Sequence, residues 1–244
     1  MKPIRYVILS FSICMILSSC NLLSKSRDND IPSYSQDDEK RMFAYQDLMK
    51  NKQFISQAKI LELERENAKL KLQNEALKNQ GYYLVIDQTE MRYYLRRGDK
   101  LIRSGVVALG KGETQVGSTT FKFYTPTGAF NILYKQENPW WHRPPWYWKE
   151  KGKAYPDSII KIPRNLNPGE ARKMYNELTE EEKDRVTVVP GELGKYKMGL
   201  GDGIFIHYGK ELGRNASHGC IRVGKADLEI LYKYLKVGDP VFVY

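Results

Sequence analysis

Cysteine is scarce in this chain, and its scarcity narrows the chemistry to consider. The 244 residues contain three cysteines, Cys14, Cys20 and Cys220, and the first two lie in or beside an amino-terminal apolar segment. If that segment is removed on export, Cys220 is the only free thiol of the mature chain. An unpaired cysteine in an exported protein indicates a reactive group, because oxidising compartments favour disulfides. The alternative is a buried, inert cysteine in a β-rich core.

Long apolar runs are lacking as well. The amino-terminal run, residues 6–17, follows Lys2 and Arg5 and is too short to predict a membrane span. It ends in Leu17-Ser18-Ser19-Cys20, a pattern that predicts a signal peptide over residues 1–19. This ending resembles a bacterial lipobox, which implies that Cys20 becomes the lipid-modified first residue of the mature chain. The alternative is a plain signal peptide followed by an unrelated cysteine.

The residues after Cys20 bear on location. By resemblance to enterobacterial sorting rules, Asn21 in place of an aspartate implies the outer rather than the inner membrane. We therefore expect a lipid-anchored protein of the bacterial cell envelope that faces the periplasm and contacts the membrane through the lipid on Cys20. Residues 20–36 are polar, with several serines, a proline and mixed charge. They predict a flexible linker, because they lack the apolar content to pack.

No basic run and no recognised nucleic-acid motif accompany the positive charge of the chain. Lysine and arginine number 39 against 29 aspartates and glutamates, a formal net charge of +10. This excess suits anionic surroundings such as lipid head groups and wall polymers. The lack of a basic run or nucleic-acid motif, together with the export signal, argues against a nucleic-acid partner. A glycine-rich phosphate cradle is excluded too, because no helix is predicted after Gly110-Lys111-Gly112.

Proline and glycine are absent from residues 37–80, which predicts a long helix that ends at Gly81. Within it, apolar residues and asparagines recur at heptad a and d positions: Ile60, Leu63, Asn67, Leu70, Asn74 and Leu77. Leucine at d with asparagine at two a positions favours a specified helix pair. We therefore predict a coiled-coil stalk and a homodimer formed through residues 60–77. The alternatives are a solitary helical spacer and a helix folded against the main domain.

Beyond Gly81 the pattern changes to short β-rich runs separated by turns. Two helical segments interrupt them. An insertion over residues 167–185 begins with the cap Asn167-Pro168-Gly169-Glu170 and restarts at Thr179-x-x-Glu182. A later helix, residues 225–236, places Leu228, Leu231 and Leu235 on one face. Residues 81–244 are therefore predicted to form one mainly β domain with short helices, with strands at 82–87, 91–95, 100–109, 129–134, 186–189 and 240–244.

All four tryptophans lie in residues 138–148, a segment that also contains three prolines. We predict a rigid aromatic loop, because the prolines disfavour a helix or a central strand. Such a loop would serve as a lid or platform for sugar rings or peptide stems, or its tryptophans would cover an edge of the core. We expect some of each. His142 in this segment is expected to be a surface residue.

The densest group of reactive side chains lies in residues 203–208 and 217–223. Ile204 and Ile206 alternate with Phe205 and His207, so a strand that buries its isoleucines directs His207 to the opposite face. In the second segment Ile221 and Val223 likewise leave Cys220 and Arg222 on the outward face. Two strands joined by a short loop would then bring His207 beside Cys220.

That arrangement suits nucleophilic catalysis. An imidazole within reach of a thiol draws its proton away, lowers the thiol pKa and leaves a thiolate and imidazolium pair. Gly219 allows close backbone approach, so the amides around His218, Gly219 and Cys220 would form a hole for an oxyanion. A zinc site made by His207, His218 and Cys220 is the alternative. It lacks a fourth ligand at a recognised spacing, and a His-x-Cys pair is not a familiar zinc motif.

The string Ser217-His218-Gly219-Cys220-Ile221-Arg222, downstream of a strand that ends in His207, resembles the signature of the L,D-transpeptidase catalytic domain (YkuD-like) family. The similarity extends to Thr125-Pro126-Thr127-Gly128 and to residues 200–207, and it covers residues 81–244. The chain departs from the family at Tyr208-Gly209, where Gly-Thr or Gly-Ser is usual, and in its helical insertion. The fold implied is a β-sandwich of mixed sheets with short helices, here preceded by a long amino-terminal helix.

The resemblance also implies a role for each matching residue. Cys220 is the nucleophile, His207 is its general base, and the carbonyl of Tyr208 orients the imidazole ring. The supporting roles fall to neighbours of the nucleophile: His218 and Gly219 line the oxyanion hole, Ser217 supports the loop, and Arg222 binds an anionic part of the substrate. No metal and no organic cofactor is implied.

The implied reaction is covalent acyl transfer in cell-wall cross-linking or remodelling. Cys220 attacks the third residue of a peptidoglycan tetrapeptide stem, the terminal D-alanine leaves, and an amine of a neighbouring stem takes the acyl group. Water, a free D-amino acid and a protein lysine are alternative acceptors. Two further hypotheses remain: an L,D-carboxypeptidase or other peptidoglycan hydrolase with the same nucleophile, and a non-catalytic wall-binding module on a coiled-coil stalk.

Overall fold

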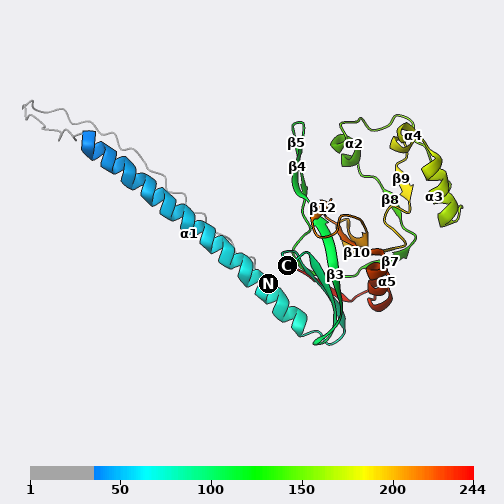
Figure 1. The fold of residues 1–244 in the computed structure, drawn as a ribbon, viewed down its shortest axis with the longest axis horizontal. Helices are drawn as coiled ribbons and strands as arrows, with labels where there is room; N and C mark the ends of the chain where they lie inside the picture. Colours follow the sequence, from blue (N-terminus) through cyan, green and yellow to red (C-terminus); the bar gives the residue numbers. More distant parts are fainter. Residues whose placement is uncertain (1–35) are drawn as a thin grey trace, which may run out of the picture. The chain divides into compact units, whose positions relative to one another are not determined.

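The structure, a computed structural model, describes residues 36–244. The predicted signal peptide, Cys20 and the linker up to residue 35 lie outside the described residues. The chain divides into two units, Met1–Ser56 and Gln57–Tyr244. The helix α1, Gln36–Leu77, forms the described part of the first unit and continues into the second (Figure 1). None of the helices within residues 36–244 combines the length and apolar content that a membrane crossing needs.

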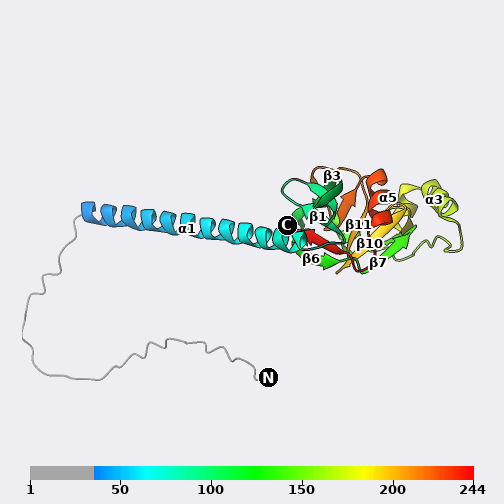
Figure 2. The same cartoon turned by 90° about the horizontal axis from the view of Figure 1, so that it is seen from below.

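The second unit is built on a ten-stranded sheet (Figures 1 and 2). Its strands follow the order β6-β14-β1-β2-β3-β13-β11-β10-β7, and β12 pairs with β3. The pairs β1/β14, β11/β13 and β12/β3 are parallel, and the other pairs are antiparallel. The strands are β1 (Tyr82–Asp87), β2 (Arg92–Arg97), β3 (Lys100–Gly110), β6 (Gly128–Asn131), β7 (Tyr134–Glu137), β10 (Tyr196–Gly201), β11 (Ile204–Tyr208), β12 (Asn215–Ser217), β13 (Ile221–Val223) and β14 (Pro240–Val243).

This architecture confirms the predicted fold class, a mixed β fold with short helices behind a long amino-terminal helix. The strands hydrogen-bond into one continuous, half-barrel-like path instead of two separate sheets. Two small two-stranded sheets lie outside that path: β4 (Gly112–Val116) with β5 (Thr119–Phe123), and β8 (Trp140–His142) with β9 (Val188–Pro190).

Strand alternation explains how the core is filled. In β1, Leu84 and Ile86 point into the main core, while Tyr83 and Val85 pack in a second cluster on the other face. The helix α5 (Lys225–Tyr234) covers the main core from the side of β10 and β11 (Figure 2). Its leucines are fully or almost fully buried, as predicted: Leu228, Leu231 and, just after the helix, Leu235.

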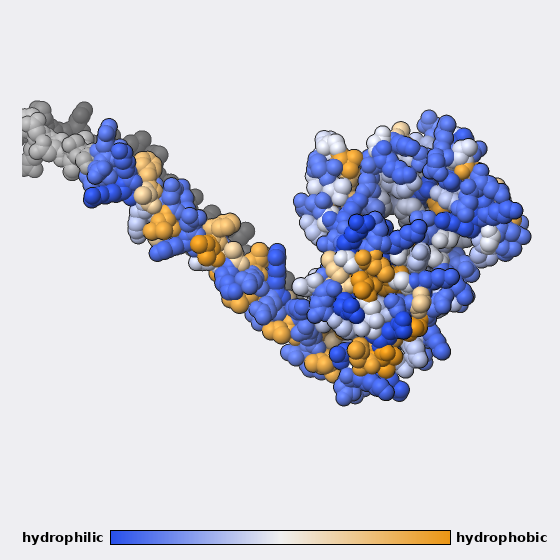
Figure 3. All heavy atoms as spheres, in the orientation of Figure 1, coloured by the Kyte–Doolittle hydropathy of each residue, from blue (hydrophilic) through white to orange (hydrophobic). Residues whose placement is uncertain are grey.

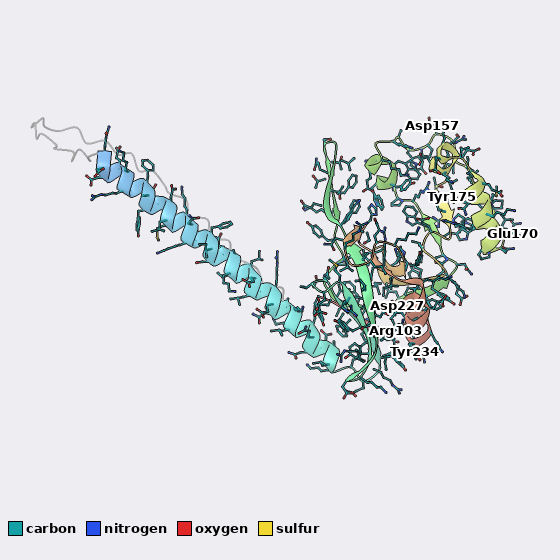
Figure 4. The ribbon with its side chains drawn as sticks, viewed as in Figure 1. Arg103, Asp157, Glu170, Tyr175, Asp227 and Tyr234 are labelled. Carbon is teal, nitrogen blue, oxygen red and sulfur yellow. The ribbon has the colours of Figure 1, made fainter. Side chains whose placement is uncertain are left out.

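An ion pair fixes the start of α5. Arg103 of β3 and Asp227 in the first turn of the helix point toward each other (Figure 4), with 2.7 Å between the guanidinium and a carboxylate oxygen. A carboxylate in the first turn also complements the positive end of the helix dipole. The pair therefore fixes the first turn of α5 against β3.

The last turns of α1 pack on the sheet. Ala76 is buried and Leu72 half-buried against the outer face of β1, and Lys69 forms an ion pair of 2.9 Å with the buried Asp87. The predicted heptad residues lie on other sides of the helix, with Leu70 and Leu77 about half-exposed. Figure 3 shows such exposed apolar residues, in orange, at intervals along α1. The end of the helix thus meets the domain through one face and leaves the heptad face open.

The insertion, defined here as residues 138–194, contains α2 (Trp146–Glu150), α3 (Pro168–Glu177), α4 (Glu180–Asp184) and the β8/β9 pair (Figure 1). Both predicted helix starts are confirmed, because Asn167 and Thr179 each form a capping box with the glutamate three residues on. The insertion has a small core of its own, which includes Ala171 and Tyr175 of α3. Figure 4 shows Tyr175 pointing from α3 toward the interior of the insertion.

The expectation that the prolines exclude a helix from the rigid aromatic loop at residues 138–148 is wrong. Trp140–His142 forms the strand β8, and a short helix begins at Trp146. The prolines are compatible with this, because Pro145 is the N-cap of α2, a position that needs no backbone N–H donor. The β8/β9 pair is an isolated two-stranded sheet, so Pro139 interrupts no central strand.

Candidate active site

Two parallel strands carry the predicted catalytic residues. The register of β11 and β13 pairs Ile206 with Ile221 and His207 with Arg222. Ile206 and Ile221 are fully buried in the core. Cys220 directly precedes β13, two residues before Arg222, and therefore lies on the same face of the sheet as His207. The structure thus places the imidazole on β11 and the thiol just before the adjacent strand β13, where both line one cavity.

The His207 ring is held by its own strand end. Its Nδ1 atom lies 2.7 Å from the carbonyl oxygen of Tyr208. A carbonyl only accepts hydrogen bonds, so Nδ1 carries the proton and Nε2 of the neutral ring is left free to accept one. This is the orienting contact that the family resemblance implies for residue 208.

The environment favours a neutral thiol and a neutral imidazole at rest. Burial, with smaller contributions from the cations Arg222 and Lys197, lowers the pKa of His207 to about 4 against the opposing effect of the Tyr208 carbonyl. Burial raises the pKa of the Cys220 thiol, although Arg222 and Lys197 partly oppose this. The thiol donates to the carbonyl of Gly203, with 3.7 Å between Sγ and O. The resting thiolate and imidazolium pair expected from the sequence is therefore not favoured.

The turn before the nucleophile is tightly bonded. Ser217, fully buried, donates to the carbonyl of Cys220 at 2.5 Å and accepts from the amide of Gly219 at 3.2 Å. Thr125 donates to the carbonyl of Gly219 at 3.0 Å and accepts from the amide of Gly110 at 2.8 Å. Gly219 has a φ of +108°, a conformation that side chains rarely adopt. Ser217 therefore supports the loop as expected, whereas the Gly219 amide points to Ser217 in this conformation and not to a bound oxyanion.

His218 belongs to a cluster that joins the turn to the insertion. Its Nε2 atom lies 2.7 Å from a carboxylate oxygen of Glu150 in α2. The Trp146 ring stacks on the imidazole with 4.2 Å between centroids, and Phe123 meets it edge-on at 4.6 Å. Lys111 bonds the other carboxylate oxygen of Glu150. These contacts fix the orientation of His218 from two sides.

The cavity above these residues has a volume of about 960 Å³. The sheet supplies its floor with His207 and Cys220, and the insertion supplies its walls with Trp146 and Tyr147 among others. The tryptophans were expected to divide between lining the site and covering the core. Trp148 is buried and donates to the carbonyl of Asp184 at 2.8 Å, whereas Trp146 faces the site. Figure 3 shows apolar residues gathered on the part of the molecule below the insertion.

Arg222 and Tyr208 are placed in supporting positions. The Arg222 guanidinium donates to the carbonyl of Ala216 at 3.2 Å and lies 3.9 Å from Glu211. Its stem passes so close over Gly209 that a Cβ there would lie 2.4 Å from it. Tyr208 packs against Gly194 at the end of the insertion and donates its amide to Leu193. The unusual Tyr208-Gly209 pair thus joins the strand to the insertion and makes room for Arg222.

His142 is exposed at the rim of the cavity, 3.4 Å from Arg164, as expected for a surface residue. Within residues 36–244, no group of three or more His, Cys, Asp or Glu side chains is placed to hold a metal ion. Glu150 and Lys197 are site residues that the sequence analysis missed. Neither belongs to a local motif, and each reaches the site only through tertiary structure.

Fold and site together define an enzyme of the acyltransferase type, with a thiol and an imidazole on neighbouring strands under a large cavity. Residues 81–243 match the L,D-transpeptidase catalytic domain family (YkuD). The chain belongs to this family. No curated relative matches the chain.

Several solved structures are similar to the chain. A mutant L,D-transpeptidase of Enterococcus faecium is 16% identical, with a TM-score of 0.41 over 68% of this chain and 50% of that one. An L,D-transpeptidase of Xylanimonas cellulosilytica is 17% identical, with a TM-score of 0.42 over 68% and 61%. An L,D-transpeptidase of Mycobacterium smegmatis is 16% identical, with a TM-score of 0.41 over 67% and 58%. This chain therefore spans between a half and two thirds of the length of these proteins.

Proposed function

We propose that the protein is a peptidoglycan L,D-transpeptidase with Cys220 as nucleophile and His207 as general base. The observation that carries the proposal is the β11/β13 register, which puts both side chains on one face at the floor of one cavity. The free Nε2 atom of His207 supports the same assignment, since a base needs an unprotonated nitrogen. The positively charged surroundings of the thiol suit an anionic transition state.

The reaction balances with these two groups. His207 Nε2 takes the thiol proton as Cys220 Sγ forms a bond to the carbonyl carbon of the third stem residue. The tetrahedral oxyanion collapses, the C–N bond to the terminal D-alanine breaks, and His207 returns the proton to the leaving amine. An amine of a second stem then attacks the thioester, gives a proton to His207 and displaces the Cys220 sulfur, which regains that proton.

The neutral resting pair makes proton transfer part of the chemical step. Because the thiol pKa is raised and the His207 pKa is lowered, the thiolate forms only as the substrate carbonyl is attacked. Since the Gly219 amide donates to Ser217 in this conformation, we propose the amide of Cys220 itself, with that of His218, as the donors to the oxyanion.

We further propose an envelope setting for the enzyme. The lipid on Cys20 would anchor it to the membrane, in the outer membrane facing the periplasm, and the polar residues 20–36 with α1 would extend the catalytic domain toward the wall. The net charge of +10 favours the anionic surface of the wall polymer. The open heptad face of residues 60–77 would pair with that of a second copy.

The decisive experiment incubates the full chain with purified tetrapeptide muropeptides and analyses the products by mass spectrometry. Cross-linked dimers and free D-alanine are expected, and Cys220→Ala is expected to abolish both. Cys20→Ser is the control, because it replaces a cysteine elsewhere in the chain, prevents lipid attachment and leaves the site intact. Tripeptides without dimers would identify an L,D-carboxypeptidase instead, and unchanged wall function of Cys220→Ala would identify a non-catalytic module. A carbapenem is expected to add covalently to the wild-type chain and not to Cys220→Ala.

A further inference from the structure

Lys197 is a half-buried cation at the site to which no role has been assigned. It lies in β10, where the antiparallel register pairs it directly with His207 of β11. On the other side, His207 pairs with Arg222 of β13. The three side chains therefore form a row across adjacent strands on the face that carries the thiol. Lys197 lines the same cavity as His207 and Cys220.

Two aromatic rings hold the Lys197 ammonium in place. Its Nζ atom lies 4.4 Å from the ring centre of Phe205 and 5.4 Å from that of Tyr134. Tyr134 lies flat on Gly199, where a Cβ would come within 2.3 Å of its ring. Aromatic faces attract a cation without neutralising it. The contacts therefore position the ammonium and leave its charge and its three donors available.

Apart from the exposed Lys210, the other cations of the cavity already have partners. Arg222 donates to a backbone carbonyl and faces Glu211, Arg172 donates to a carbonyl at 2.8 Å, and Lys151 donates to Tyr147 at 2.6 Å. Burial lowers the pKa of Lys197, and among the residues that the structure describes only the thiolate form of Cys220 opposes this. A half-buried ammonium without a carboxylate partner is costly unless a ligand supplies one.

The order of the strands indicates which carboxylate of the substrate would pair with the Lys197 ammonium. His207 must reach the leaving amine to protonate it, so the leaving residue lies over β11, beside the thiol. In the sheet, β11 with His207 is followed, on the side away from Cys220, by β10 with Lys197. In a tetrapeptide stem, the α-carbon attached to the leaving amine carries the free terminal carboxylate. That carboxylate is the anion nearest to the row of side chains on the Lys197 side.

We propose that Lys197 binds the free carboxylate of the leaving residue and so selects donors in which a single residue with a free carboxylate follows the scissile bond. The inference rests on the transpeptidase function proposed above. Lys197 is a specificity-determining residue in this role. A pentapeptide, in which a further residue follows the leaving one, is a poor donor because its corresponding carboxyl group is an amide.

The test compares two tetrapeptide donors that differ only at the carboxyl end, one a free acid and the other a carboxamide. The wild-type chain is expected to prefer the acid by about 10- to 100-fold in kcat/KM, the size of one charge-assisted hydrogen bond. Lys197→Met is expected to remove this preference, because it slows turnover of the acid about 10- to 100-fold more than turnover of the amide. Lys197→Arg keeps the charge and is expected to keep most of the preference. Lys210→Met is the matched control, because Lys210 is an exposed lysine at the same cavity.

A second measurement makes the inference independent of turnover. The rate at which iodoacetamide alkylates Cys220 is followed in a chain with Cys14→Ser and Cys20→Ser, with and without each donor. The acid is expected to protect the thiol at a lower concentration than the amide in the wild type, and at the same concentration in Lys197→Met. The alkylation rate without donor is measured for each variant as its own baseline, because the Lys197 ammonium partly opposes the raised pKa of the Cys220 thiol.

The two proposals fail in different ways. Protection by the acid without turnover of either donor would overturn the transpeptidase function and keep the assignment of Lys197. Equal turnover or equal protection by acid and amide in the wild type would overturn the assignment, as would absence of protection. A Lys197→Met variant that loses activity equally on both donors, with a parallel fall in alkylation rate, would also overturn it and make Lys197 a group that tunes the thiol.

Discussion

The imidazole of His218 and the carboxylate of Glu150 form a direct contact, with 2.7 Å between Nε2 and a carboxylate oxygen. Glu150 lies four residues after Trp146 in α2, so the two side chains occupy one face of the helix. Trp146 stacks on the same imidazole. One short helix of the insertion thus holds the residue two positions before the nucleophile by both an ion contact and a ring contact. The walls of the cavity and the nucleophile turn are therefore mechanically coupled.

Glu150→Gln is expected to reduce kcat/KM by about 10-fold, because it weakens a charge-assisted hydrogen bond that positions the turn. Burial opposes ionisation of Glu150, yet the bonds from Lys111 and His218 outweigh it and lower its pKa, so the wild-type residue is charged. Burial lowers the pKa of His218 and Glu150 partly restores it, so the variant is expected to show a still lower His218 pKa by NMR titration.

Glu192→Gln is the control for this effect. Glu192 also lines the cavity, but its partner is Arg172 at 3.5 Å and not the nucleophile turn. It is expected to leave kcat/KM within about twofold and the His218 titration unchanged. Equal losses in the two variants would show that the coupling through His218 is unimportant.

The buried imidazole of His207 makes stability depend on pH. Its pKa of about 4 in the folded protein lies below the ordinary value of 6.5, so the unfolded chain binds the proton more readily between these values. The free energy of unfolding is therefore expected to be unaffected by this group above pH 6.5. It should fall by up to about 1.4 kcal/mol per pH unit as the pH drops from 6.5 toward 4.

Urea unfolding at intervals between pH 4 and pH 8 measures this slope. The variant His207→Gln removes the titrating group and is expected to show a shallower decline over the same window, so the difference between the two chains isolates His207. The same slope in both would show that another group, such as His218, accounts for the decline.

The sequence predicted those parts of the molecule that depend on local rules. Asn167 and Thr179 were identified as helix caps because a side-chain oxygen and a glutamate three residues on form a contiguous motif. The alternation of Ile206 with His207 predicted which face each occupies, because a strand has a period of two. The outward position of Cys220 followed in the same way.

The rest depends on which segments meet in space. Glu150 lies 68 positions before His218, and no local pattern links the two. Nothing in the sequence distinguishes Lys197 from the other lysines, and only the β10/β11 register pairs it with His207. The resting ion pair was expected from the neighbourhood of a thiol and an imidazole alone, whereas their charge states depend on burial and on two cations from separate strands. The error at residues 138–148 arose because a proline before a helix and a proline within one have opposite effects.

Thr125→Val is expected to destabilise the nucleophile turn. The buried Thr125 hydroxyl joins the amide of Gly110 to the carbonyl of Gly219, and valine of similar shape leaves both groups unpaired. The loss in free energy of unfolding is expected to be about 1–3 kcal/mol, with a fall in the acylation rate of Cys220 by a carbapenem. Thr127→Val is the control, because the Thr127 hydroxyl accepts an exposed hydrogen bond from Gln88 and is expected to cost less than about 0.5 kcal/mol. A similar cost for both would contradict the role given to Thr125.

The heptad face of α1 predicts a dimer that single substitutions can break. Leu63, Leu70 and Leu77 recur every seven residues and are about half-exposed, whereas Leu72 and Ala76, on another side of the helix, pack on β1. Pairing through the leucines is therefore compatible with the contact between the helix end and the domain.

Leu70→Lys is expected to weaken self-association at least 10-fold, because it places a charge at a d position of the helix pair. Leu61→Lys is the matched control: Leu61 has the same exposed fraction as Leu70, 49%, but lies outside the a and d positions. Sedimentation of the full chain with Cys20→Ser, which prevents lipid attachment, measures the association. A dimeric wild type, a dimeric Leu61→Lys and a monomeric Leu70→Lys at micromolar concentration are the expected results. A wild type that stays monomeric at high micromolar concentration would leave α1 as a solitary spacer.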